Sequence, residues 1–306
     1  MLTSTLSSAA GGLSVSVPGL ARSIERSGRD QVHVVGVEDS NDIAASSDWG
    51  GRVFAHRPLG PRAFGFASGI QRTLSRLESD VIDVQGLWTY ASLANLRHHR
   101  HYGTPYVITP RGMLDPWARE NSRWKKKAAQ VWFENSHLAQ AFCLRATAEM
   151  EAEHFRSFGL RNPIAIVPNG VNVPSPLPAR SNGSRRRLLF LSRIHPKKGI
   201  ALLLSAWAEI EKVRPEWELV IAGPDEVGHT AEMQGFAQKL KLQRVEWLPA
   251  VHGKYKSSLY RSADCFVLPT HAENFGLVVA EALAHEIPVI TTRNAPWQGL
   301  QRQKCG

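Results

Sequence analysis

The C-terminal half of the chain alternates short apolar runs with longer amphipathic segments, and this alternation restricts the fold more than any other feature. Strands are expected where the apolar runs occur, at 188–192, 217–222, 244–248, 265–268 and 288–291. A strand with one solvated face alternates apolar and polar residues, whereas a nearly continuous apolar run is typical of a strand covered on both faces. The pattern therefore predicts an α/β fold built on parallel sheets.

Amphipathic helices are expected between these strands. Ile200, Leu203, Leu204 and Trp207 recur at helical spacing, and Pro215 ends that helix. Further helices are expected at about 229–241, 254–262 and 275–285. Strands and helices thus alternate along this half of the chain, as in doubly wound Rossmann-like domains.

The N-terminal half has the same organisation in a weaker pattern. A helix is expected at 14–27, and strands are expected at 31–37, 52–56, 81–85, 105–109, 141–145 and 164–167. Residues 173–187 combine three prolines with Ser, Asn and Gly and lack an apolar period, which is typical of a linker. The prediction is an N-terminal domain at 1–172, a linker at 173–187 and a C-terminal domain at 188–306, with a ligand cleft at the carboxyl ends of the strands.

Composition and charge exclude several classes of protein. The 37 Lys and Arg against 27 Asp and Glu give a net charge of +10, but four of the arginines lie within 180–187. A nucleic-acid-binding surface more often shows a broad basic stripe with aromatic residues, so no nucleic acid partner is expected. No run approaches the ~20 apolar residues of a membrane span. The first cation is Arg22 and the three cysteines are widely spaced, so a cytoplasmic protein is expected.

The strongest chemical signal is the segment His271–Glu281, which follows a predicted strand and opens a helix. Glu273 precedes the helix, and Glu281 lies eight residues further on among Val and Ala residues, a poor setting for a solvated face. Ionised carboxylates only accept hydrogen bonds, so the pair suits a ligand rich in hydroxyl groups. Gly276 permits close approach of a ligand, and free N–H groups at the helix start favour an anion. The alternative is a pair of solvated acidic residues on an amphipathic helix.

The basic loop Ser192–Gly199 is a second signal, and it also lies between a strand and a helix. Arg193 can grip a diphosphate with its planar fork, and Lys198 can act on it as a point charge. Such a loop alone is more often simply solvated. An acidic segment on a neighbouring strand end favours a binding role for it instead. Gly11 and Gly12, before the first helix, are a weaker signal, because a plain turn explains them equally well.

Together these segments resemble the retaining glycosyltransferases of the GT-B fold, the large nucleotide-sugar-dependent family known as glycosyl transferase group 1 or family 4. The resemblance rests on Glu273-x7-Glu281 with Asn-Phe-Gly between the two, on Arg193 and Lys198-Gly199, and on 167–171 and 221–224. Three more pieces resemble members that build bacterial surface polysaccharides, at 86–88, 110–113 and 295–297. The implied fold is two Rossmann-like parallel-sheet domains facing a cleft.

The resemblance implies catalytic roles for three residues. Arg193 and Lys198 would hold the donor diphosphate, and Glu273 would hold the donor sugar. Glu281 would accept hydrogen bonds from the ribose hydroxyls, and Gly12 would face the phosphates from the opposite domain. The backbone around the sugar would complete the donor site, at Asn274, Phe275, Gly276 and Leu277.

Two residues are candidates for the acceptor side. Arg111 would lie in the cleft, near donor or acceptor. Gln85 stands where many relatives have a histidine, immediately before the Gly-Leu-Trp element. A glutamine can donate a hydrogen bond but cannot carry a proton, so this departure puts turnover or acceptor handling in doubt.

The predicted activity is transfer of a hexose from an NDP-sugar to a glycan or lipid-linked acceptor, with retention of configuration. Negative charge grows on the leaving diphosphate in the transition state, and fixed cations such as Arg193 and Lys198 would stabilise that charge. No cofactor and no metal ion is therefore expected. Two alternatives stay open: a GT-B nucleotide-sugar epimerase, and a catalytically impaired fragment that binds nucleotide-sugar.

The segment 123–135 raises the question of a membrane. Helical spacing would place Trp124, Ala128, Val131 and Trp132 on one face, with Lys125–Lys127 beside it. This is typical of a helix lying on an anionic membrane surface, and equally of a helix packed under a neighbouring element. The first interpretation would make the protein peripheral to the inner face of the cytoplasmic membrane.

Both ends depart from the family pattern. Only Leu2–Leu6 precedes the glycine pair, as a short remnant of the expected first strand. The C-terminal domain stops at Gly306, where the pattern normally continues with a strand and terminal helices. The expectation is a chain truncated at both ends, with an incomplete C-terminal domain.

Overall fold

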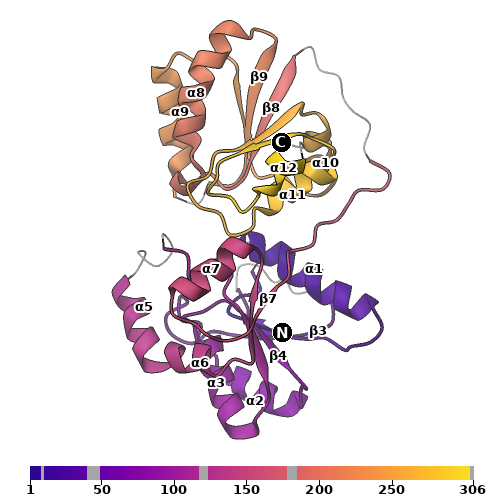
Figure 1. Ribbon diagram of the computed structural model, residues 1–306, viewed down its shortest axis with the longest axis vertical. Helices are drawn as coiled ribbons and strands as arrows, with labels where there is room; N and C mark the ends of the chain where they lie inside the picture. The colour runs from indigo at the N-terminus through magenta and orange to yellow at the C-terminus, as the bar shows by residue number, and fades with distance from the viewer. Residues whose placement is uncertain (8–9, 40–48, 117–122, 178–184, 226, 304–306) are drawn as a thin grey trace. The chain divides into compact units, whose positions relative to one another are not determined.

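The computed structural model divides the chain into two compact units, Met1–Gly170 and Val171–Gly306 (Figure 1). It describes residues 1–7, 10–39, 49–116, 123–177, 185–225 and 227–303. Part of the expected linker at 173–187 therefore lies outside the described residues. Each unit has hydrophobic core clusters of its own.

The first unit is built on a sheet of seven parallel strands in the order β3-β2-β1-β4-β5-β6-β7. Its strands are β1 (Leu2–Thr3), β2 (His33–Val37), β3 (Arg52–His56), β4 (Ile82–Gln85), β5 (Tyr106–Thr109), β6 (Cys143–Ala146) and β7 (Ile164–Ile166). β1 is a central strand of this sheet, because Leu2 pairs with Val35 on one side and Val84 on the other.

Helices cover both faces of this sheet. They are α1 (Gly12–Arg26), α2 (Ser68–Leu77), α3 (Tyr90–Tyr102), α5 (Arg123–Ala129), the π-helical turn η3 (Gln130–Glu134), α6 (Asn135–Ala139) and α7 (Glu149–Ser157). Successive residues of a strand point to opposite faces. Accordingly, Val34 packs with Val17 and Ala21 of α1, whereas Val35 belongs to the larger core beneath α2 and α3.

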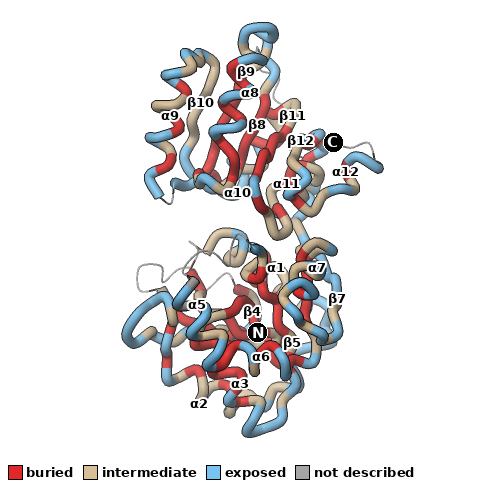
Figure 2. Tube along the Cα trace, turned by 60° about the vertical axis from the view of Figure 1, so that its left-hand side comes forward, coloured by how far each residue is buried: buried red, intermediate tan, exposed pale blue. Residues whose placement is uncertain are grey.

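The second unit has five parallel strands in the order β10-β9-β8-β11-β12. The strands are β8 (Arg186–Leu191), β9 (Trp217–Ala222), β10 (Val245–Leu248), β11 (Cys265–Leu268) and β12 (Val289–Thr291). Between them lie η4 (Pro196–Lys198), α8 (Ile200–Val213), α9 (His229–Lys239), α10 (Gly253–Arg261), α11 (Leu277–Ala284) and α12 (Gly299–Gln303). The central strands are the most buried part of the unit (Figure 2).

The predicted fold class is confirmed: both units are α/β layers on parallel sheets. β3, β9 and β11 have the bounds expected from the sequence, and the apolar runs of β9 and β11 are mostly buried. Other ends shift by a residue or two; α11, for example, begins at Leu277 rather than 275. Turn residues before a helix are often apolar, so the sequence alone does not mark its first residue.

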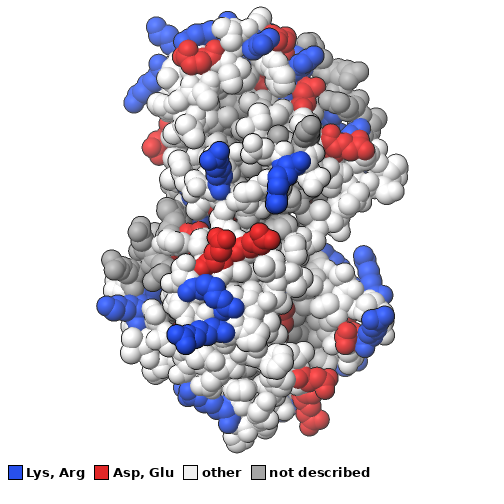
Figure 3. All heavy atoms as spheres, in the orientation of Figure 1, with Lys and Arg blue, Asp and Glu red and all other residues white. Residues whose placement is uncertain are grey.

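The surface carries both signs of charge. On the face in view, Lys and Arg lie in separate groups with Asp and Glu between them, over both units (Figure 3). The described part of the chain has no helix that is long and apolar enough to cross a membrane.

Candidate functional site

In the second unit, the two signals of the sequence meet at one sheet edge. β8 and β11 are neighbouring parallel strands, so the loops that follow them leave the sheet side by side. The Lys198 ammonium donates a hydrogen bond to Oε2 of Glu273, and both side chains are mostly buried. The backbone N–H of His271 also donates to the Lys197 carbonyl, at 2.8 Å. The structure therefore brings Lys198 and Glu273 together as one ion pair.

Gly199 allows this close approach. Its φ is +70°, and a Cβ atom there would lie 2.0 Å from the carbonyl oxygen of Pro269. Any other residue would push the two loops apart and separate Lys198 from Glu273. Helix α8 begins at the next residue, so its free amides start beside the ion pair.

Arg193 lies in the same loop, between β8 and η4. The segment that follows β9 fixes the start of this loop: the N–H of Ile194 donates to the Pro224 carbonyl at 2.8 Å. A Cβ atom on Gly223 would lie 1.7 Å from the Ser192 carbonyl oxygen, so only glycine fits there. The 221–224 segment singled out in the sequence therefore has a structural use, which is to hold the loop of Arg193.

The loop Glu273–Gly276 is held by a hydrogen bond within the loop and by one to the chain after β12. The Asn274 N–H donates to Oε1 of Glu273 at 3.2 Å, and the Glu273 N–H donates to the Asn294 carbonyl at 3.2 Å. Gly276 has φ +76° and is followed directly by Leu277, the first residue of α11. The first turn of α11 contains no acidic side chain, so its amides present the positive end of the helix dipole.

Glu281 already has two protein partners, which the sequence analysis did not identify. Its Oε1 accepts from the Lys256 ammonium at 2.6 Å, and its Oε2 accepts from the Tyr260 hydroxyl at 2.9 Å. Burial, and then the negative charge of Glu281, raise the pKa of Tyr260 well above its usual range, so the hydroxyl keeps its proton. Lys256 and Tyr260 lie four residues apart on α10, a spacing that the sequence shows.

In the first unit, the Arg111 side chain links its own loop to three other segments. Its Nε donates to Oε1 of Gln85 at 2.8 Å, and its Nη1 donates to Ser16 Oγ at 3.1 Å and to Asn169 Oδ1 at 2.7 Å. Burial, and then the charge of Arg145, lower its pKa to about 10, so it stays charged at neutral pH. Its Nη2 is buried and has no hydrogen-bond partner among the described residues.

Gln85 is almost fully buried and acts as a bridge. Its side-chain amide donates to Oδ2 of Asp83 at 2.6 Å while its oxygen accepts from Arg111. Both ends of the amide are therefore in use. Asp83, Ser16 and Asn169 complete this group. The sequence does not single out Asp83 or Ser16, whereas Asn169 lies in the 167–171 segment that carries the family resemblance.

Gly12 is the first residue of α1, and its carbonyl accepts from Ser16 Oγ at 2.7 Å. Ser16 in turn receives the bond from Arg111. Gly12, Arg111 and Gln85 therefore belong to one hydrogen-bonded group at the carboxyl ends of β4 and β5. Gly11 has φ +60°, a backbone conformation that favours glycine.

A buried carboxylate supports the chain just after Gln85. Glu134, in the π-helical turn η3, accepts from the Trp88 N–H at 2.6 Å and interacts with His137 Nδ1 at 2.8 Å. Trp88 has φ +66°, an uncommon conformation for a residue with a side chain. The bond to Glu134 stabilises that conformation and so fixes the turn that follows β4.

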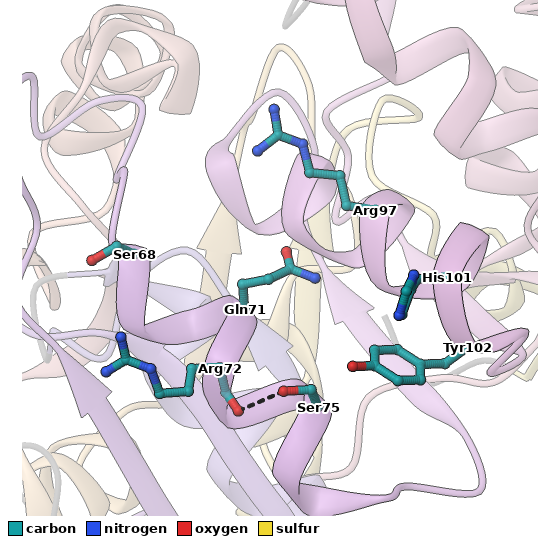
Figure 4. A pocket seen from close by; sticks show the side chains of 7 residues that line it. All are labelled: Ser68, Gln71, Arg72, Ser75, Arg97, His101 and Tyr102. Atoms are coloured by element: carbon teal, nitrogen blue, oxygen red, sulfur yellow. Dashed lines mark hydrogen bonds between the residues drawn. The ribbon is translucent and has the colours of Figure 1, made fainter.

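A surface hollow of about 520 Å³ lies between α2 and α3, away from all of these residues (Figure 4). Its lining is polar and cationic and consists of Ser68, Gln71, Arg72, Ser75, Arg97, His101 and Tyr102. None of the site residues expected from the sequence contributes to it. His98, beside this lining on α3, is buried.

The same fold occurs in solved structures. Anabaena HepE in complex with UDP and glucose superposes with a TM-score of 0.76 at 17% identity, over 98% of this chain and 82% of that one. Two α/β units with parallel sheets and this likeness define the GT-B fold.

The family follows from the sequence models. The glycosyl transferase 4-like domain model matches residues 11–170, and the model of glycosyl transferases group 1 matches residues 178–298. The first match alone covers more than half of the chain, and the chain belongs to this glycosyltransferase family.

Two curated relatives are D-inositol 3-phosphate glycosyltransferases. That of Segniliparus rotundus is 30% identical over 52% of this chain, and that of Actinosynnema mirum is 29% identical over 74% of it. The chain spans 39% and 59% of the length of these two relatives.

Proposed function

We propose that this protein is a glycosyltransferase that transfers a hexose from an NDP-sugar to a glycan or lipid-linked acceptor. The observation that carries the proposal is the Lys198–Glu273 pair, set at the start of two helices on neighbouring strand ends. A cation there suits a diphosphate, and a carboxylate beside it suits the hydroxyl groups of a sugar. Family membership and the UDP and glucose bound to the HepE structure support the same donor class.

In this proposal the chemistry needs no metal ion. Arg193 and Lys198 stabilise the charge that grows on the leaving diphosphate, and Glu273 holds the sugar through its hydroxyls. Transfer with retention then proceeds by attack on the same face of the sugar, assisted by the leaving phosphate. Glu281 accepts hydrogen bonds from the ribose hydroxyls through the lone pairs that Lys256 and Tyr260 leave free.

The test is a panel of UDP- and GDP-sugars, incubated with the purified chain and a lipid or glycan extract. The expected products are free nucleoside diphosphate and a new glycoside whose anomeric configuration matches the donor. An excess of EDTA should leave the rate unchanged. Epimerised donor without a glycoside would show an epimerase, and tight donor binding without any product would show a binding fragment.

We also propose that the first unit contacts an anionic membrane surface through the segment 123–135. Trp124, Val131 and Trp132 are 73%, 76% and 67% exposed, and α5 also carries Lys126 and Lys127. Exposed indoles with nearby ammonium groups favour an anionic lipid interface. Replacing Trp124 and Trp132 together by Ser should abolish binding to anionic liposomes; unchanged binding would end the idea.

A further inference from the structure

The chain after β12 contacts the loop after β11 at three points. Thr292 Oγ1 donates to the Thr270 carbonyl at 2.6 Å, and the Asn294 carbonyl accepts the Glu273 N–H at 3.2 Å. The third contact is the Trp297 indole N–H, which donates to the Phe275 carbonyl. These contacts bind the loop on the side of β12 along most of its length.

Trp297 has the largest side chain of the three residues that make these contacts. Its ring lies against the Phe275 ring, with centroids 5.5 Å apart at an interplanar angle of 56°. A Cβ atom on Gly276 would lie 3.3 Å from Trp297 Nε1 and 3.2 Å from Glu273 Cγ. The indole and the Glu273 side chain therefore both lie close to Gly276.

The indole bond fixes the direction of one peptide group. The C=O and N–H of a trans peptide point in opposite directions, so a Phe275 carbonyl held by Trp297 turns the Gly276 N–H away from the indole. Gly276 is the residue before α11 and has a φ of +76°, which few other residues tolerate. Without the indole, this short loop loses the contact that selects one orientation of the peptide.

We propose that Trp297 is a positioning residue for the sugar half of an NDP-sugar. It holds the Phe275–Gly276 peptide and thereby the Glu273–Gly276 loop in the conformation that binds the sugar hydroxyls. The inference rests on the proposed function of this site. It assigns Trp297 no part in nucleotide binding, because its indole N–H and its ring both contact the sugar loop.

The test compares Trp297→Phe and Trp297→Leu with the unaltered chain in calorimetric titrations. UDP-glucose and GDP-mannose are each paired with the corresponding nucleoside diphosphate. Trp297→Phe keeps a ring against Phe275 but loses the hydrogen bond, so the affinity for the sugar nucleotide should fall about two- to tenfold. Trp297→Leu should lose more, and the affinity for UDP or GDP should stay the same in both variants.

A matched control is Trp217→Phe, on β9 of the same unit, where the ring packs under the Arg186 guanidinium at 5.9 Å. It should leave both affinities unchanged. Equal losses for nucleotide and sugar nucleotide in the Trp297 variants would overturn the inference, as would no loss at all. If the unaltered chain bound neither nucleotide nor sugar nucleotide, the proposed function itself would fail.

A second readout needs no ligand. Hydrogen exchange at Phe275–Leu277 should be at least about tenfold faster in Trp297→Phe, while exchange in β8 and β9 stays slow. Unchanged exchange in the loop would contradict a positioning role. Because Phe is a mild replacement, this measurement remains possible if Trp297→Leu does not fold.

Discussion

At the scale of single residues, Glu281 depends on neighbours that surround its carboxylate. Lys256 and Tyr260 each hold one oxygen, so the side chain has a fixed direction before any ligand arrives. A carboxylate with two oxygens has about four lone-pair positions, which leaves room for ribose hydroxyls as well. Orientation of this kind raises affinity by reducing the entropy that binding removes.

Lys256→Met should therefore weaken nucleoside diphosphate binding about three- to tenfold, because an oriented carboxylate becomes a loose one. Titration calorimetry with UDP and GDP measures the effect. Lys254→Met, an exposed position on the same helix, is the matched control and should change nothing. Equal affinity of Lys256→Met and the unaltered chain would show that Glu281 does not bind the ribose.

In the first unit, Arg111 is likewise a charged side chain that its hydrogen-bond partners hold in one direction. Arg111→Lys keeps the charge, but one ammonium group cannot reproduce the fork that links Gln85, Ser16 and Asn169. We expect turnover to fall at least about tenfold while donor affinity, which we assign to the second unit, stays within about twofold. A variant with weakened donor binding and normal turnover would place Arg111 on the donor side instead.

At the scale of elements, helix α3 ends in a histidine run that is only partly solvated. His98 is buried, and its Nε2 lies 3.1 Å from Thr104 Oγ1. Burial, and then the charges of His101 and His99, lower the pKa of His98 below its usual value. The end of this helix is therefore stabilised by a neutral imidazole.

This shift has a definite sign in the stability of the fold. The unfolded chain takes up the His98 proton at a higher pH than the folded one, so stability is complete above about pH 6.5 and falls as the pH drops through the folded pKa. In urea titrations at pH 7 and pH 5, His98→Gln should lose less stability between the two than the unaltered chain. His252→Gln, at an exposed position, is the control; an unchanged difference in His98→Gln would refute the assignment.

At the scale of the whole molecule, each unit has its own hydrophobic core. Lys198, Glu273 and Glu281, which we propose bind the donor, all belong to the second unit, whereas Arg111 and Gln85 belong to the first. Ligand binding stabilises the structure that forms the site, by about 2.7 kcal/mol at a hundred times the Kd. Binding of a nucleotide should therefore stabilise the two units unequally.

Hydrogen exchange resolved by mass spectrometry tests this expectation. Saturating UDP or GDP should slow exchange in the buried strands β8 and β11 of the second unit and leave β4 and β5 of the first unit as they were. Denatured chain in the same nucleotide serves as the exchange reference. Equal slowing in both sheets would show that the nucleotide acts on one cooperative structure.

The sequence by itself determined the fold class and the family resemblance, and it singled out the two loops that we propose bind the donor. Apolar runs leave a local trace of a strand buried on both faces, and a glycine before a helix leaves a local trace of a close approach. Partners far apart in the chain leave no such trace. Lys198 and Glu273 are 75 residues apart, and Ser16 and Arg111 are 95 residues apart.

The order of strands in each sheet decides which of these residues meet. β8 and β11 are neighbours although β9 and β10 lie between them in the chain, and that placement joins the basic loop to the acidic one. The hydrogen bond from Trp297 to Phe275 likewise depends on β12 lying next to β11. The sequence singled out the candidate residues, but only the tertiary structure decided their partners, because hydrogen bonds depend on distance in space and not on distance along the chain.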